Sequence, residues 1–501
     1  MNQRRLRVML LTASVILMLA SMPLAFDFSE LEKAVSEYEL DNGLKILIME
    51  RHDAPVVSFV TWVDVGGVND PKEYTGLAHM FEHMAFKGTR EIGTTDINAE
   101  LEAMRVEDSI WYELREERKK GIRADSTRLA ELENAFADAV EAAGQYVVTN
   151  DFQLKLQAHG VQGLNAGTSK DQTMYMMSLP SNKVELWMAT ESERFLNPVL
   201  REMYRERDVI AEERRQTLEN NPIMRTIWSL MGIAYKAHPY GVTIDGHMSD
   251  IQNYTRDAAK AYFDKYYVPS NMVVAIVGDV NPKNVFKLAQ KYWGRLTARP
   301  KPEAFATVEP EQKGERRLEL EDRAQPFFVA GWHVCEDTHP DWPALEALTD
   351  YLGKGRTSLL YTNLVKEKKI AATSVALIGW PASKYPSMLV AFAIPSPNHT
   401  NEECEEQIFT EVEKIRQEVI PVEEVEKIKA RAKAAFVNSL GSNMGLAMQL
   451  CGYQTGYGDW RELFRQLDKI NAVTPEDIQR VAQKYLTKKN RSVAKLNTVE
   501  G

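Results

Sequence analysis

The stretch TGLAHMFEHMAFKGT, residues 75–89, places two histidines and a glutamate at helical spacing within an apolar run. On a helix, His79 and His83 lie at i and i+4 on one face, and Glu82 lies beside them. Burying this trio without a partner would be costly, which favours a metal site over two packed histidines. Two neutral imidazoles suit Zn²⁺, and a catalytic zinc needs a third protein ligand and an open position for water. We therefore predict His79 and His83 as zinc ligands and Glu82 as the base that deprotonates the water.

The order H-x-x-E-H resembles the inverted-motif zinc peptidases, the family of pitrilysin, insulin-degrading enzyme and mitochondrial processing peptidase. The resemblance runs from about residue 36 to the C-terminus and is strongest to the short, processing-peptidase-like bacterial members. It implies a zinc metalloendopeptidase that hydrolyses peptides or unfolded protein segments. It also implies one Zn²⁺ per chain, with Glu82 as the general base.

The resemblance places the third ligand in ERDVIAEERRQTLENNP, residues 206–222. There Glu213 matches the family's ligand, and Glu206, two helical turns earlier, matches an acid that orients a ligand histidine from the outer shell. Glu212 is the alternative ligand if the register shifts by one residue. On its own, this stretch would be interpreted as a solvated, charged helix.

Between these two segments, GLNAGTSKDQTMYMMSLP, residues 163–180, resembles the family's substrate-binding edge strand and the strand that returns from it. An edge strand offers unpaired backbone groups to which an extended peptide can add. Asn165, Ala166 and Thr168 are therefore predicted substrate contacts. An ordinary hairpin is the alternative.

The chain contains two related halves. TRDAAKAYFDKYYVPSN, from Thr255, aligns without gaps with TPEDIQRVAQKYLTKKN, from Thr474, and VSFVTWVDV likewise matches PFFVAGWHV, pairing Trp62 with Trp332. Each half mixes β-rich runs with amphipathic helices, so we predict an α+β fold of two homologous domains, each an antiparallel sheet flanked by helices. Together they would form half of a clamshell-type chamber, as in the family.

The predicted domain boundaries follow from these repeats. A catalytic, zinc-binding domain spans 36–296, a polar, proline-containing linker spans 297–314, and a catalytically empty domain spans 315–501. The first half is the longer one, and the charged segment at about 105–148 is the insertion that explains the difference. Its helical periodicity, a break near Gly121 and a cap at Asp125 or Ser126 predict a helical hairpin. It would be a surface elaboration or an arm that docks a partner or gates substrate.

One departure from the family concerns the second half. Where many members carry an arginine and, seven residues later, a tyrosine that bind substrate, LVKEKKIAATS places Val365 and Ala372. The chain is therefore expected to act as a dimer, with a heterodimer whose partner supplies the missing pair as one form; Lys366 is a partial substitute. The contrasting hypothesis is a non-catalytic or partner-dependent subunit of an assembly, which uses the fold for structure or peptide binding.

The N-terminus and the composition indicate where the protein is located and which kinds of partner and site are excluded. Residues 1–26 combine arginines with an apolar run, which indicates a signal peptide or a membrane anchor and an exported, periplasmic catalytic part. The net charge of −10 argues against nucleic-acid binding. The three cysteines are far apart in sequence and are predicted to be buried or inert thiols.

Overall fold

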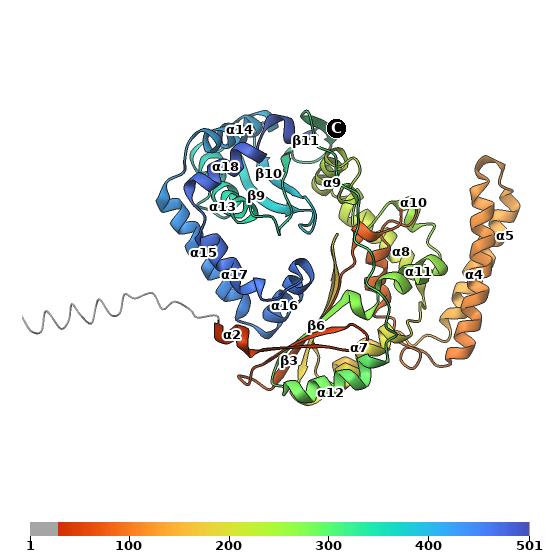
Figure 1. Ribbon diagram of the computed structural model, residues 1–501. Helices are drawn as coiled ribbons and strands as arrows, with labels where there is room; N and C mark the ends of the chain where they lie inside the picture. The colour runs from red at the N-terminus through yellow and green to blue at the C-terminus, as the bar shows by residue number, and fades with distance from the viewer. Residues whose placement is uncertain (1–28, 500–501) are drawn as a thin grey trace, which may run out of the picture. The chain divides into compact units, whose positions relative to one another are not determined.

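Two β-sheets organise the computed structural model, which describes residues 29–499 (Figure 1). The first sheet has the strand order β1-β2-β6-β3-β5-β4, and the second has the order β7-β11-β8-β10-β9. The strands of the first sheet are β1 (Val35–Glu39), β2 (Lys45–Glu50), β3 (Val56–Val63), β4 (Gln162–Thr168), β5 (Thr173–Pro180) and β6 (Met272–Gly278). Those of the second are β7 (Arg316–Asp322), β8 (Phe327–His333), β9 (Ala371–Trp380), β10 (Met388–Pro395) and β11 (Arg491–Thr498).

The α+β prediction is confirmed, but the sheets are mixed rather than purely antiparallel. In the first sheet β2 runs parallel to β6, with Lys45 opposite Val273, and in the second β11 runs parallel to β7, with Ser492 opposite Arg316. The other registered pairs are antiparallel. A parallel pair needs a long crossover, and in each half the chain returns only after several helices.

Helices flank both sheets. In the first half they are α3 (Leu77–Met84), α4 (Ile97–Lys119), α5 (Ser126–Gly144), α6 (Asp151–Ala158), α7 (Val184–Leu196), α8 (Met203–Arg214), α9 (Pro222–Ala234), α10 (Met248–Ile251), α11 (Arg256–Tyr266) and α12 (Pro282–Tyr292). Helix α2 (Ser29–Ala34) precedes β1 in the chain. In the second they are α13 (Trp342–Gly353), α14 (Asn401–Gln417), α15 (Val422–Leu440), α16 (Asn443–Tyr457), α17 (Glu462–Asn471) and α18 (Pro475–Tyr485). The repeat noticed in the sequence corresponds to α11 and α18, which begin at the capping residues Thr255 and Thr474.

Each half contributes one helix to the sheet of the other half. Helix α16 lies on the first sheet, where the Cys451 thiol is 3.9 Å from the Val60 carbonyl oxygen. Helix α9 lies on the second sheet, where Arg316 donates to the Ile233 carbonyl and a ring nitrogen of His333 lies 3.0 Å from the Ala234 carbonyl oxygen. Leu230, Met231 and Ala234 of α9 belong to one apolar cluster with residues of the second sheet, and the buried side of α16 includes Leu446 and Leu450. The two halves therefore bury apolar side chains against each other.

The segment expected to be an insertion, at about 105–148, covers most of α4 and all of α5, which are drawn side by side in Figure 1. Helix α4 begins at Ile97, before the expected position, and Asp125 caps α5 by accepting from the Thr127 and Arg128 amides. Trp111 anchors the pair from within α4, because it is buried and donates to the Tyr254 carbonyl at 2.9 Å.

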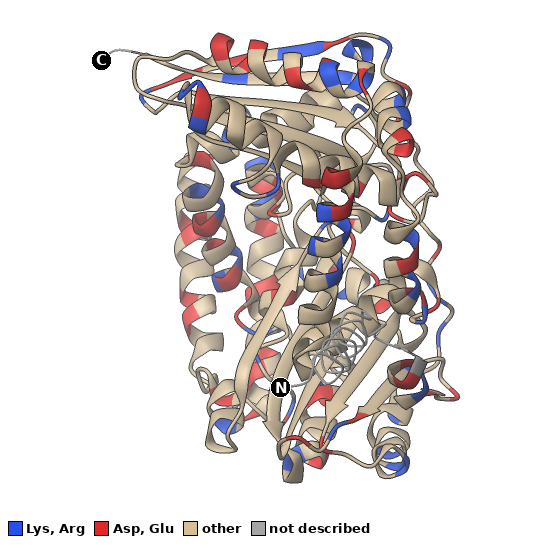
Figure 2. Ribbon diagram, turned by 90° about the vertical axis from the view of Figure 1, so that its left-hand side faces the viewer, with Lys and Arg blue, Asp and Glu red and all other residues tan. Residues whose placement is uncertain are grey.

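Residues 297–314 contain no helix or strand, and Glu309 there accepts from the amides of Lys236, Ala237 and His238. All three cysteines are buried and unbridged. Basic and acidic side chains are interspersed along the helices in the view of Figure 2. The predicted signal or anchor at 1–26 lies outside the described residues, and no helix within residues 29–499 has the length and apolar character to cross a membrane.

Asp341 links α13 to α18 by hydrogen bonds, and its carboxylate should stabilise the fold in a pH-dependent way. Its carboxylate accepts from Arg480 and Lys484, each at 2.6 Å, and from the Tyr485 hydroxyl at 2.8 Å. Burial raises the pKa of Asp341, but these bonds outweigh burial and hold the pKa well below its usual range. Such a carboxylate stabilises the fold above its unfolded pKa of about 3.9, and this contribution is lost as pH falls through the folded pKa.

We expect Asp341→Asn to lower the free energy of unfolding by about 1–2 kcal/mol at pH 7, and the difference from wild type to shrink below about pH 4. Urea denaturation at pH 7 and pH 3 measures both values. Asp53→Asn, at an exposed aspartate, is the matched control. An Asp341→Asn deficit of equal size at both pH values would contradict this account.

Candidate metal centre and active site

Helix α3 presents His79 and His83 on one face because its other face is apolar and buried. Leu77, Met80, Phe81 and Met84 pack into the core of the first half. The start of the helix is held by Asp70, whose carboxylate accepts from the amides of Gly76 at 2.7 Å and Ala78 at 2.9 Å. These bonds satisfy amides that a helix N-terminus otherwise leaves unpaired.

Gly76 allows the loop before α3 to approach its neighbour closely. The residue has φ of 91°, and a Cβ there would lie 2.4 Å from the Asp245 carbonyl oxygen. Only glycine fits this position without a backbone shift. The loop that carries Asp245 is thereby brought beside the first turn of α3.

Glu213, on α8, meets the two histidines. Its Oε2 lies 3.9 Å from His79 Nε2 and 3.6 Å from His83 Nε2. The imidazole rings are perpendicular, with centroids 4.9 Å apart. Within residues 29–499, these three side chains form the one group of potential metal ligands found, with ligand atoms all within 4.8 Å of one another. The structure therefore brings together the residues predicted as ligands, whereas the alternative Glu212 bonds to Arg215 and Gln216.

This donor set fits zinc. Two imidazole nitrogens and one carboxylate oxygen converge, which is the three-ligand pattern of catalytic zinc sites. The site is also open on one side, since the Glu213 side chain is 41% exposed whereas that of His79 is 9% exposed. A fourth position for water or substrate is therefore accessible from the Glu213 side.

Each histidine has a carboxylate close to its Nδ1 atom, the ring nitrogen that faces away from Glu213. Glu206 Oε2 lies 3.2 Å from His83 Nδ1, at hydrogen-bond distance. Asp245 Oδ1 lies 3.4 Å from His79 Nδ1, within ion-pair distance, but His79 Nδ1 forms no hydrogen bond with the described residues. Burial raises the pKa of Glu206, but hydrogen bonds from His83 and Lys87 outweigh burial and lower it. Acids in these positions fix the orientation and tautomer of ligand histidines and raise their basicity.

Sequence reasoning predicted Glu206 but missed Asp245. Asp245 precedes Gly246 in a loop 166 positions after His79, and an Asp-Gly pair signals only a turn. No spacing rule connects such a loop to α3. The contact arises because Gly76 and Gly246 let the two loops pack backbone to backbone.

We expect Asp245→Asn to weaken zinc binding about 10–100-fold, as is typical when the outer partner of a ligand histidine is lost. Competition with a chelating dye of known zinc affinity measures this change without reference to catalysis. Asp41→Asn, at an exposed loop aspartate, removes the same charge elsewhere. Equal zinc affinity in Asp245→Asn and wild type would show that Asp245 does not position His79.

Glu82 lies on α3 between the two histidines in sequence and, with His83, lines a cavity of about 360 Å³. Phe86, Val147 and Val148 supply apolar lining, and Glu202 and Glu206 supply acidic lining that Lys87 bridges. The residue predicted to be the base is therefore half-buried beside the ligand group. The cavity offers space for a small side chain or a short stretch of backbone.

The residues predicted to contact substrate lie on β4, an edge strand of the first sheet. Asn165 is exposed, Thr168 is half-buried, and the Ala166 side chain packs into the core. Ala166 could therefore meet a peptide only through its backbone. In the second half, Val365 lies in a π-helical turn (Tyr361–Glu367) and Ala372 is exposed on β9, an edge strand of the second sheet.

Comparison with known proteins agrees with this geometry. The family model for insulinase, peptidase family M16, matches residues 45–143 and 142–246, and that for the M16 inactive domain matches residues 253–432. The zinc protease PqqE of Helicobacter pylori is 29% identical over 461 residues, covering 89% of each chain. The mitochondrial-processing peptidase subunit β of Lentinula edodes is 26% identical over 482 residues, covering 92% of this chain and 90% of the relative.

A solved structure gives the same assignment. The crystal structure of a protease from Helicobacter pylori superposes with a TM-score of 0.76 at 26% identity, covering 92% of this chain and 99% of that chain. Both sheets, the H-x-x-E-H helix and the matched segments thus point to one family. The chain belongs to the M16 peptidases, the family of insulinase and pitrilysin.

Proposed function

We propose that the chain is a zinc-dependent endopeptidase that acts on peptides or unfolded protein segments. The observation that carries this proposal is the convergence of His79 Nε2, His83 Nε2 and Glu213 Oε2, with a carboxylate behind each histidine. These three side chains would hold one zinc ion. When bound there, zinc supplies Lewis acidity, which polarises a peptide carbonyl and lowers the pKa of water.

Residues of this chain would transfer the proton and bind the substrate. Glu82 accepts a proton from the attacking water and later donates it to the leaving amine. The unpaired edge of β4 binds the substrate main chain, with Asn165 and Thr168 beside it. Because an edge strand recognises extended backbone, folded proteins would be poor substrates.

The proposal is tested on purified chain with casein as an unfolded substrate. Dialysis against a zinc chelator should remove cleavage, and addition of about one equivalent of Zn²⁺ should restore it. Cleavage that survives complete zinc removal, with the zinc content checked by mass spectrometry, would refute the proposed mechanism.

A partner-dependent subunit is the second candidate function. Val365 and Ala372 occupy the positions of an arginine and a tyrosine in many family members, so this chain would lack part of the substrate-binding surface. We propose that it acts as a dimer, with a related chain as the candidate partner. Stoichiometric zinc without casein cleavage, followed by cleavage when a co-purified partner is added, would favour this candidate.

We further propose that the catalytic part is exported to a periplasm-like compartment. The arginine-rich, apolar residues 1–26 support this localisation. Fractionation of cells that produce the full chain tests it. Recovery of the protein in the cytoplasmic fraction alone would contradict export.

A further inference from the structure

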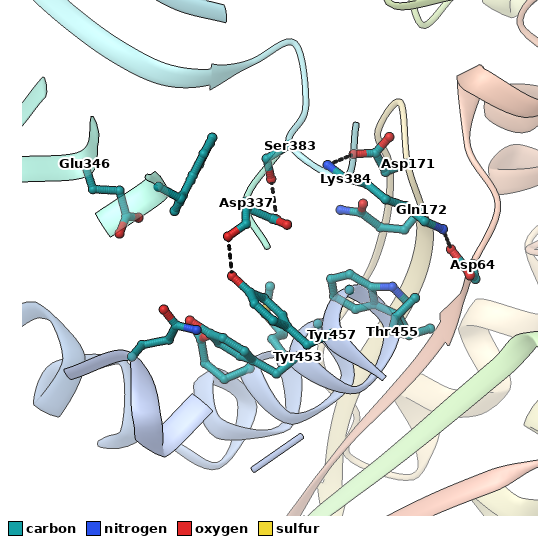
Figure 3. Close-up of a pocket in the computed structure, with 17 residues that line it drawn as sticks. Asp64, Asp171, Gln172, Asp337, Glu346, Ser383, Lys384, Tyr453, Thr455 and Tyr457 are labelled. Atoms are coloured by element: carbon teal, nitrogen blue, oxygen red, sulfur yellow. Dashed lines mark hydrogen bonds and ion pairs between the residues drawn. The ribbon is translucent and has the colours of Figure 1, made fainter. Parts of the chain in front are cut away.

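A second cavity, of about 420 Å³, lies between the two halves of the chain and shares no lining residue with the cavity beside Glu82 (Figure 3). Its walls come from β3 and the β4–β5 turn of the first half and from α13, the β9–β10 loop, α16 and α17 of the second. A volume of roughly 300–1,000 Å³ is typical of sites for small ligands. Neither the proposed metal centre nor the β4 edge accounts for this cavity.

Two of its four acidic side chains already have partners within the protein. Lys384 forms an ion pair with Asp64, to which Lys301 also pairs at 3.0 Å. Asp171 accepts from the Tyr240 hydroxyl at 2.7 Å and from the Lys384 amide at 3.0 Å. These two carboxylates are therefore less available to a ligand than the other two.

The other two acids, Asp337 and Glu346, form no ion pair within residues 29–499. Asp337 Oδ2 accepts from the Ser383 hydroxyl at 2.8 Å, whereas its Oδ1 is buried without a hydrogen-bond partner in the described chain. Surrounding protein raises the pKa of Glu346, and the charge of Asp337 acts in the same direction. A hydrogen bond from Trp342 opposes this rise in the pKa of Glu346, and so does the charge of Lys354, whose own ion pair is with Asp350.

Aromatic rings stand beside these two carboxylates. Tyr453 and Tyr457, on α16, are stacked with centroids 5.2 Å apart, and the Tyr457 hydroxyl donates to the Asp337 carbonyl at 2.9 Å. Figure 3 shows both tyrosines projecting from one helix toward the side of the pocket that carries Asp337 and Glu346. Trp342 also lines the cavity. Lys469 Nζ already lies over the Tyr457 ring, 5.4 Å from its centroid, whereas no cation of the described residues is placed over Tyr453 or Trp342. Aromatic faces combined with carboxylates are the usual surroundings of bound organic cations.

Other lining side chains also keep unused hydrogen-bonding capacity. Within residues 29–499, Thr455 Oγ1 is buried without a partner, and a hydroxyl oxygen can accept from a cationic donor. Trp62 Nε1 and Gln466 Nε2 are also unpaired, but both are N–H donors, to which a cation offers no acceptor. A divalent metal ion is a poorer fit, because within residues 29–499 three or more ligand side chains converge only at His79, His83 and Glu213.

We propose that this cavity binds an organic monovalent cation, a guanidinium or primary ammonium group on an alkyl chain, between Asp337, Glu346 and the rings of α16. The Glu346 side chain remains exposed to solvent, so such a group can reach it. The cation would be an arginine or lysine side chain of a peptide, or a free amine. Binding here does not depend on peptide hydrolysis.

Isothermal titration of the full, zinc-loaded chain tests this proposal with n-butylguanidinium and its neutral analogue n-butylurea, neither of which has a peptide bond. We expect binding of butylguanidinium only, weakened at least about tenfold by Glu346→Gln and by Asp337→Asn. Glu336→Gln is the matched control, because it removes the same charge next to Asp337 from a residue that does not line the cavity. Thermal melts verify that each variant folds.

Equal binding of the urea and the guanidinium, no detectable binding of either, or equal weakening by Glu336→Gln would overturn the proposal. A second arm compares butylguanidinium with N-acetyl-arginine amide. Tighter binding of the amide in wild type, lost in Glu346→Gln, would assign the site to a peptide side chain. Equal affinities that are both lost in that variant would assign it to a free amine or guanidine.

Discussion

Replacement of Glu82 with glutamine should abolish peptide cleavage while the zinc content of the chain stays unchanged. Glutamine keeps the shape of the side chain but cannot take a proton from water or return one to the leaving amine. General acid–base catalysis contributes roughly 10²–10⁴-fold, so the rate of casein cleavage should fall at least about a hundredfold. Glu82 is not one of the three converging ligands, so zinc should stay bound.

The measurements are casein cleavage and zinc content, both made on the same preparation. Glu91→Gln is the matched control, because Glu91 is exposed and close in sequence. Substantial turnover by Glu82→Gln would refute Glu82 as the base. Loss of zinc together with activity would instead place Glu82 among the residues that hold the metal.

Replacement of Glu213 with glutamine should remove zinc as well as activity. A neutral amide oxygen is a much weaker ligand than a carboxylate. Even the loss of a group that hydrogen-bonds to a ligand side chain typically lowers metal affinity 10–100-fold. We therefore expect zinc affinity to fall by more than about a hundredfold and casein cleavage to disappear at low zinc. Dye competition and mass spectrometry of the purified variant measure the two effects.

The neighbouring residue provides a sharp control. Glu212→Gln makes the same chemical change one position earlier, on a side chain that bonds to Arg215 and Gln216 and not to the histidines. It should retain zinc and activity. The reverse outcome, zinc lost from Glu212→Gln and kept by Glu213→Gln, would reassign the third ligand.

Local patterns account for what was predictable in the site. His79, Glu82 and His83 lie within five residues, so helical geometry alone places them together. Glu213 is far away in sequence, and its selection depended on the resemblance to a family with a known second segment. Asp245 has neither a local spacing nor a matching motif, and only the close approach of two glycine-containing loops places it behind His79.

The same distinction applies to the fold. Alternation of apolar strands and amphipathic helices predicted the α+β class and the repeat at Thr255 and Thr474, because both are properties of contiguous residues. The parallel pairs β2–β6 and β7–β11 join strands far apart in the chain, and hydropathy does not distinguish them from antiparallel neighbours. The exchange of α9 and α16 between the halves was also not predicted, since an apolar helix face does not specify which sheet it covers.

By itself, therefore, the sequence determined the α+β class, the duplicated halves and a metal-binding helix, because short-range periodicity encodes each of these. Only the tertiary structure decided which acid backs His79, which helix covers which sheet, and that Asp337 and Glu346 share a cavity with Tyr453 and Tyr457. These last contacts join α16 to segments about a hundred residues earlier in the chain. Their free energy comes from burial between surfaces that no local pattern pairs, so they appear only when the whole chain is packed.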